Sequence, residues 1–205
     1  MDFRNVLMAI VLSTIVLIFW ATFFEPPPVE KQIAQDQVTE REELSSPSVE
    51  KDESSKKITR KDAIDNVSRI KIENDNIKGS ISLQGAIIDD IMFKNYNISL
   101  DSNEKVILLN PKSTSKGYYI ETGWASNSKE KLKLPLDNTI WKVKGNNLLT
   151  PNTPVVIDWD NNEGLVFTKK IELDEEFLFR ITQNIKNTSD KSYKFYPYAQ
   201  ITRNY

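Results

Sequence analysis

The chain has 205 residues and a formal net charge of −2, and 39% of its residues are hydrophobic. This size fits one soluble domain with an additional short segment, and the near-neutral charge lacks the basic footprint of a nucleic-acid-binding protein. Cysteine and histidine are both absent. Their absence excludes disulfides, thiolate zinc sites, cysteine nucleophiles and catalysis by histidine, so the commonest kinds of enzyme active site are missing.

The first predicted element is an uncharged, apolar run at residues 6–24. As a helix rising ~1.5 Å per residue, it would be roughly 28 Å long. A bilayer core is ~30 Å thick, whereas a cleaved signal peptide has only ~7–15 apolar residues. Trp20, Phe23 and Phe24 are typical of a membrane interface, and three prolines follow. We therefore predict a retained transmembrane signal-anchor over residues 1–24, with Arg4 favouring a cytoplasmic amino terminus.

Residues 25–66 are the second predicted segment. They are dense in Glu, Lys, Ser and Gln and contain no aromatic residue. Such a composition cannot bury enough apolar area to offset the entropy that ordering would cost. We therefore predict a disordered, charged tether.

Residues 67–205 form the third predicted segment, a β domain. Short runs rich in Ile, Val, Phe, Tyr and Trp alternate with period two and are separated by turn residues; these runs cover residues 68–75, 79–85, 105–110, 117–124, 139–145, 154–174, 177–187 and 192–205. Repeated short strands of this kind predict an antiparallel β-sandwich with little helix. The β-prone run at 193–205 would leave an open edge, which suggests a domain truncated at its carboxyl end.

Two acidic motifs are candidates for chemistry. Residues 158–162, Asp-Trp-Asp-Asn-Asn, imitate the start of a calcium loop, but Glu163 and Lys169 occupy the positions where such a loop needs Gly and Glu. We predict a hairpin turn there. Asp89 and Asp90 could be a catalytic pair, but adjacent strand residues point to opposite faces. A strand end or turn is the favoured interpretation, so we predict no catalytic, metal-binding or cofactor-binding residue.

The aromatic residues Tyr118, Tyr119 and Trp124 are the first candidate for a binding surface. Aromatic side chains also supply much of the area buried in protein cores, and core packing is the favoured interpretation of this cluster. One functional alternative is a membrane-anchored periplasmic carbohydrate- or protein-binding β-sandwich module.

Five motifs together resemble one family. Residues 4–9 match an amino-terminal "RN-L-x-A" anchor, residues 78–91 a "KGSISLKGARIDDL" stretch, and residues 118–124 a "YYxExGW" motif. Residues 149–167 match "LTPxxPVxLxWDNGxGLxF" with Asn162 in place of Gly, and residues 195–203 match "FPYxxIxR" with one additional residue. In this order the motifs resemble the YidC-type membrane protein insertases of Gram-negative bacteria, and the α-proteobacterial members most.

The resemblance implies a fold and a function. The implied fold is an antiparallel β-supersandwich related to galactose mutarotases, whose histidine-dependent activity this chain cannot share. The implied function is insertion and folding of inner-membrane proteins, alone or with the Sec translocon and its accessory subunits, with the main domain in the periplasm. The family's five-helix insertase core would follow Tyr205, so we expect this chain to hold only the anchor and periplasmic domain, without a cofactor.

Overall fold

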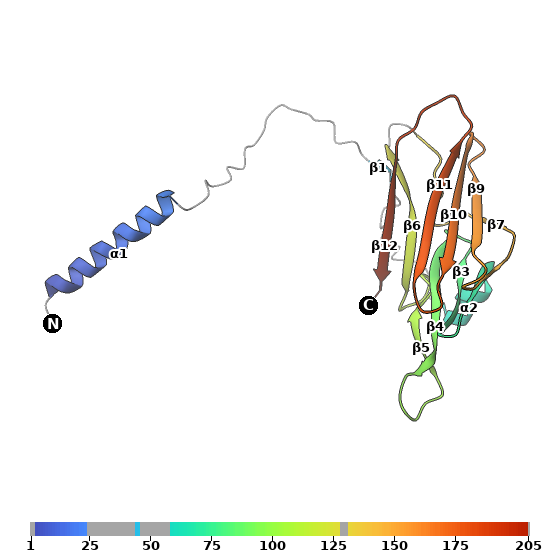
Figure 1. The fold of residues 1–205 in the computed structure, drawn as a ribbon, viewed down its shortest axis with the longest axis horizontal. Helices are drawn as coiled ribbons and strands as arrows, with labels where there is room; N and C mark the ends of the chain where they lie inside the picture. Colours follow the sequence, from blue (N-terminus) through green and yellow to red (C-terminus); the bar gives the residue numbers. More distant parts are fainter. Residues whose placement is uncertain (1–2, 24–43, 46–57, 128–130, 205) are drawn as a thin grey trace. The chain divides into compact units, whose positions relative to one another are not determined.

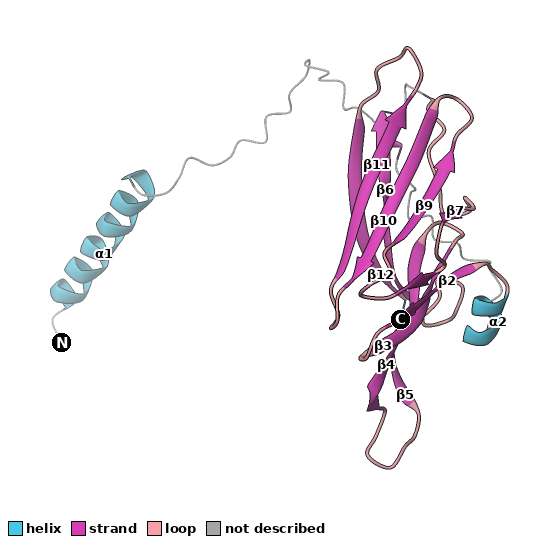
Figure 2. Ribbon diagram, turned by 45° about the vertical axis from the view of Figure 1, so that its right-hand side comes forward, coloured by secondary structure: helices cyan, strands magenta, loops and turns pink. Residues whose placement is uncertain are grey.

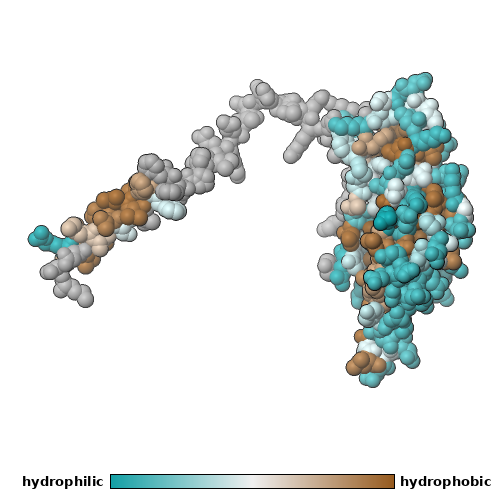
Figure 3. All heavy atoms as spheres, viewed as in Figure 1, coloured by the Kyte–Doolittle hydropathy of each residue, from teal (hydrophilic) through white to brown (hydrophobic). Residues whose placement is uncertain are grey.

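The structure is a computed structural model that describes residues 3–23, 44–45, 58–127 and 131–204. The chain divides into two units, Met1–Arg41 and Glu42–Tyr205. Helix α1 (Phe3–Phe23) belongs to the first unit, and its apolar side chains are exposed, as the brown atoms of the helix show in Figure 3. Within the described ranges, no helix is both long and apolar enough to cross a membrane. Helix α1 confirms the predicted helix. The predicted membrane span is not confirmed.

The sequence predicted a disordered tether over residues 25–66, but the structure has two ordered elements within this range. Strand β1 (Leu44–Ser45) pairs with strand β6, and helix α2 covers Arg60–Asp65. Thr59 caps α2, because its hydroxyl oxygen accepts from the backbone N–H of Asp62 at 3.2 Å, and Ala63 is buried. The rest of the predicted tether, up to residue 57, lies outside the described residues.

In the described residues of the second unit, eleven further strands complete two sheets with β1 (Figure 1). Their bounds are β2 Arg69–Glu73, β3 Ile77–Ser82, β4 Ile87–Asn97, β5 Lys105–Leu109, β6 Tyr118–Asn127, β7 Lys142–Lys144, β8 Leu148–Leu149, β9 Val155–Asp160, β10 Leu165–Leu173, β11 Phe179–Asn187 and β12 Phe195–Arg203. The larger sheet has the order β1-β6-β4-β3-β2-β8, with β12 also paired to β6 and β5 to β4. The smaller sheet has the order β11-β10-β9-β7.

The pairing confirms a mainly β, antiparallel fold. The pairs are antiparallel except for β2 with β8, which is parallel. The buried core contains side chains of both sheets, and Phe167 of β10 packs edge-on against Trp124 of β6 with ring centroids 5.1 Å apart. This packing of two sheets over a shared core is that of a β-sandwich.

Strand β4 was missed by the sequence analysis. It lies between β6 and β3 in the larger sheet. With β5 it forms the hairpin at the lower end of the domain in Figure 2. Beside it, Gly79 of β3 has no room for a side chain, because a Cβ atom there would lie 1.8 Å from the carbonyl oxygen of Asp90. The residues of the proposed acidic pair therefore belong to a tightly paired strand rather than to a strand end or turn.

Candidate functional site

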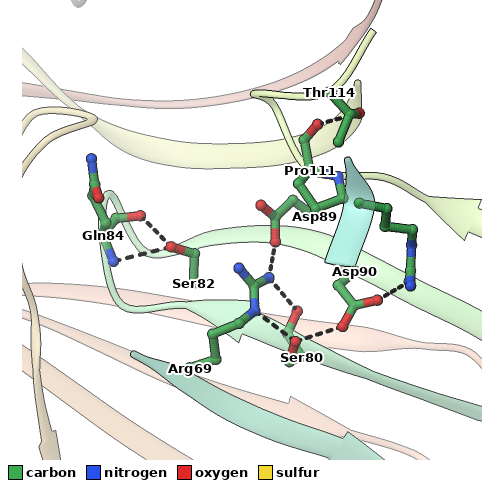
Figure 4. Close-up of polar contacts among 9 residues, drawn as sticks. Arg69, Ser80, Ser82, Gln84, Asp89, Asp90, Pro111 and Thr114 are labelled. Atoms are coloured by element: carbon green, nitrogen blue, oxygen red, sulfur yellow. Dashed lines mark hydrogen bonds and ion pairs between the residues drawn. The ribbon is translucent and has the colours of Figure 1, made fainter. Parts of the chain in front are cut away.

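The acidic pair lies in the interior and is bound by arginines. Asp89 and Asp90 are 5% and 7% exposed. Asp89 forms an ion pair with Arg69 of β2, and Asp90 forms one with Arg60 of α2. Ser80 joins the two pairs, because it accepts from Arg69 Nε at 2.7 Å and donates to Asp90 at 2.6 Å (Figure 4).

This geometry indicates a structural role. Burial raises the pKa of Asp89, and the charge of Arg69 partly opposes that rise. Each carboxylate has its own guanidinium, so the two do not share one proton as a catalytic dyad would. The cluster joins α2, β2, β3 and β4 in one polar network.

The calcium-like motif is the turn between β9 and β10, as the sequence predicted. Asn162 and Gly164 have φ angles of +58° and +91°, which Asn and Gly tolerate best. Asn161 is buried, and its side-chain oxygen accepts from the backbone N–H groups of Glu163 and Leu165 at 2.8 and 3.0 Å. Among the described residues, no group of acidic side chains could hold a metal ion.

The aromatic cluster is divided between the two faces of β6. Trp124 is buried in the core and stacks on Trp141 with ring centroids 6.3 Å apart. Tyr119 is also buried, whereas the half-buried ring of Tyr118 lies 5.3 Å from the guanidinium carbon of Arg203. Trp124 therefore belongs to the core and the half-buried Tyr118 packs against it from the same face of β6, whereas Tyr119 is buried on the opposite face.

We predict different results for the two tyrosines. Tyr119→Ala should lower the free energy of unfolding by about 3 kcal/mol, because it removes a buried ring. Tyr118→Ala should have a smaller effect, because its ring is only half buried. Urea unfolding of both variants, together with crosslinking to partner proteins, tests this. Unchanged stability with lost crosslinking in Tyr119→Ala would contradict a packing role for its buried ring.

Lys169 is a buried cation that the sequence analysis did not select. It is 1% exposed and lies in the row of β10 side chains that also contains Leu165, Phe167 and Ile171. Its Nζ donates to the backbone carbonyl of Thr122 at 2.5 Å and lies 5.0 Å from the ring centroid of Trp141. Burial lowers the pKa of Lys169 to about 7, against a smaller opposing effect of Glu121. The sequence does carry a signal for this burial, because Lys169 alternates in step with the apolar residues Leu165, Phe167 and Ile171 and so shares their face of the strand.

A groove opens between the two sheets where β11 and β12 lie. It has a volume of about 480 Å³, and its lining includes Ile120 and Thr122 of β6, Ile181 and Gln183 of β11, and Pro197 and Ala199 of β12. None of the residues that line it carries a formal charge at neutral pH. In Figure 3, brown apolar atoms lie among hydrophilic ones on the domain face that carries these strands. The groove therefore offers a largely apolar surface.

Comparison with known proteins identifies the family. A family model described as "YidC periplasmic domain" matches residues 69–205. The chain belongs to the YidC family. The matched residues 69–205 contain strands β2 to β12 of the β-sandwich. The match therefore names the same family as the sequence motifs.

Named relatives extend the match beyond the domain. The membrane protein insertase YidC of Pelagibacter ubique is 47% identical over 206 residues, which is 100% of this chain and 37% of the relative. The YidC proteins of Bradyrhizobium diazoefficiens and Beijerinckia indica are 33% and 34% identical, each over 98% of this chain and 36% of their own length. The chain thus spans little more than a third of these relatives.

Proposed function

We propose that this chain supplies the periplasmic, non-enzymatic binding part of a membrane protein insertase that aids insertion and folding of inner-membrane proteins. The observation that carries the proposal is the match to YidC insertases along the whole chain, with the periplasmic-domain model over residues 69–205. We also infer that the two sheets form the β-supersandwich that the resemblance implies, and that residues 1–24 act as the anchor and residues 67–205 as the domain, to which α2 (Arg60–Asp65) is joined by the ion pair of Arg60 with Asp90.

The chemistry of the domain supports binding rather than catalysis. The sequence has no histidine or cysteine. The buried carboxylates Asp89 and Asp90 are both paired with arginines, and the buried Lys169 has no access to solvent. A groove with an uncharged, largely apolar lining can contact apolar polypeptide.

We propose that α1 attaches the chain to the inner membrane, with the amino terminus in the cytoplasm and the domain in the periplasm. The support is the apolar surface of α1, with Phe3 79% and Met8 73% exposed, which suits a lipid environment better than water. The chain has no cysteine, so single-cysteine variants report topology directly. A membrane-impermeant maleimide should label Ser102→Cys in cells with a permeabilised outer membrane, and Asp2→Cys only after lysis. The reverse pattern would refute this orientation.

The proposed partners are nascent membrane proteins and the Sec translocon with its accessory subunits. A ribosome-bound membrane-protein chain carrying a photo-reactive residue in an apolar segment should crosslink to this protein in inner-membrane vesicles. The control is a secreted, soluble protein arrested at the same length. Equal yields from both chains, or no adduct with the membrane protein, would refute the proposed function. Binding of a sugar in place of these adducts would favour a carbohydrate-binding module.

A further inference from the structure

Helix α2 is too short to be stable by itself. It has six residues, and Ala63 is the buried residue among them. Isolated helices shorter than about 12–15 residues are marginal in water. The capping bonds between Thr59 and Asp62 lie within the first turn, so they do not attach the helix to the sheets. The order of α2 therefore depends on the contacts that hold it against the domain.

Two polar contacts attach residues 58–66 to the rest of the domain, as far as the structure describes it. Arg60 forms the ion pair with Asp90, and the backbone N–H of Ile58 donates to the carbonyl of Ser113 at 3.3 Å, which is long for such a bond. The attachment also has a cost. The Nε atom of Arg60 is buried and donates to no acceptor among the described residues, and a buried donor without an acceptor opposes the docked state.

The polar network beneath α2 is complete without the helix (Figure 4). Ser80 accepts from Arg69 Nε at 2.7 Å and donates to Asp90 at 2.6 Å, and Arg69 also pairs with Asp89. These four residues belong to β2, β3 and β4. If α2 moves away, Asp90 keeps the bond from Ser80 and exchanges the guanidinium of Arg60 for water. The side chain of Arg60 is already 24% exposed, compared with 7% for that of Arg69.

We propose that residues 58–66 form a clasp that opens and closes while the β-sandwich remains folded. The closed clasp and β1 hold the chain that precedes the domain at two places, beside Ser113 and at the end of β6. The open clasp leaves the two-residue pairing of β1 as the remaining contact among the described residues, and it releases roughly 30 Å of extended chain. The opening does not depend on the proposed function, whereas its use as an adjustable link to a membrane-attached α1 rests on it.

Hydrogen exchange of the full chain in lipid nanodiscs, followed by mass spectrometry, tests the clasp. The amides of Ala63 and Asn66 donate to carbonyls within α2 and its amino-terminal cap. The peptide that contains them should exchange at least a hundredfold faster than peptides from β2 and β3. Low concentrations of urea should accelerate exchange in β2 and β3 but not in α2, because a local opening exposes little surface. Equal protection, or an equal response to urea, would overturn the proposal.

Two variants separate the ion pair from the helix itself. Arg60→Met removes the pair with Asp90, and Lys61→Met removes a charge from the neighbouring exposed position. We expect Arg60→Met to lower the protection of α2 at least tenfold and Lys61→Met to change it less than twofold. In Arg60→Met the strands should lose no more protection than α2 had, because the limit is a folded sandwich with an open clasp. A larger loss in the strands, or equal effects of the two variants, would overturn the proposal.

A thiol probe tests the opening without removing the ion pair. The chain has no cysteine, so Ala63→Cys in α2 and Ala125→Cys in β6 each place a single thiol at a buried position. The two alanines are 6% and 5% exposed. We expect a maleimide to label Ala63→Cys at least a hundredfold faster than Ala125→Cys in the folded protein, with thermal unfolding as the check that both variants are folded. Equal labelling rates would overturn the clasp.

These measurements require neither insertion nor membrane attachment. If Asp2→Cys and Ser102→Cys give the reverse of the expected topology while α2 exchanges as expected, the proposed attachment fails and the clasp stands. If the topology is as proposed but α2 is protected like the strands, only the clasp fails.

Discussion

Arg69→Met should lower the free energy of unfolding of the domain by about 3–5 kcal/mol, because it leaves a buried carboxylate without its partner. The side chains of Arg69 and Asp89 are both only 7% exposed. Burial already raises the pKa of Asp89, and removal of the arginine removes the charge that opposes the rise. Urea unfolding at pH 7 measures the loss.

The same variant should recover stability in acid. A carboxyl group whose pKa is raised in the folded state holds a proton there that the unfolded chain has released. Stability lost at neutral pH therefore returns as pH falls through the folded-state pKa. The double variant Arg69→Met, Asp89→Leu should regain most of the loss at pH 7, whereas Glu73→Gln, which breaks the exposed pair with Lys94, should change stability by less than about 1 kcal/mol. A double variant no more stable than Arg69→Met would refute the ion-pair explanation.

Lys169 should make the stability of the domain depend on pH above neutrality. The pKa of this lysine falls from 10.5 to about 7 on burial. Between these values the unfolded chain binds a proton that the folded chain does not, so a rise in pH favours folding. The free energy of unfolding should increase by about 1.4 kcal/mol per pH unit in this window from Lys169 alone. Below about pH 7 both states carry the proton, and this contribution becomes constant.

Lys169→Met is the matched variant, because methionine keeps an unbranched side chain and lacks the charge. The difference between the two proteins isolates the contribution of Lys169, because both proteins share every other titratable group. We expect the variant to be more stable at pH 7 and the advantage to shrink as pH rises towards 10. Parallel stability curves between pH 7 and 10 would show that Lys169 titrates normally in the folded state.

The sequence predicted those features that depend on local pattern. Alternation identified β10 and β12, and the Asn and Gly residues after Asp160 predicted the turn. Strand β4 escaped detection because Asp89 and Asp90 interrupt its apolar run like a turn. Their partners Arg60 and Arg69 lie 30 and 20 residues away, and only the fold shows that the charges are compensated.

The remaining features depend on topology. Helix α2 has only six residues, too few for a helical period to emerge from a charged stretch. Among the described residues, the groove forms where β11 ends the smaller sheet beside β6 and β12 of the larger sheet, and no local pattern specifies which strands lie at the edges. The absence of histidine and cysteine was readable from the sequence and excludes catalysis by an imidazole or a thiol.

Site-specific photocrosslinking from this protein tests the binding role most directly. A photo-reactive residue is placed in turn at two exposed positions of the domain, 182 on β11 and 199 on β12, while a defined membrane protein is arrested during its insertion. We expect adducts with the arrested membrane protein from at least one position, and no adducts with an arrested secreted protein from either. No adduct with the membrane protein from either position, or equal yields with the two arrested proteins, would contradict a domain that acts by binding membrane proteins.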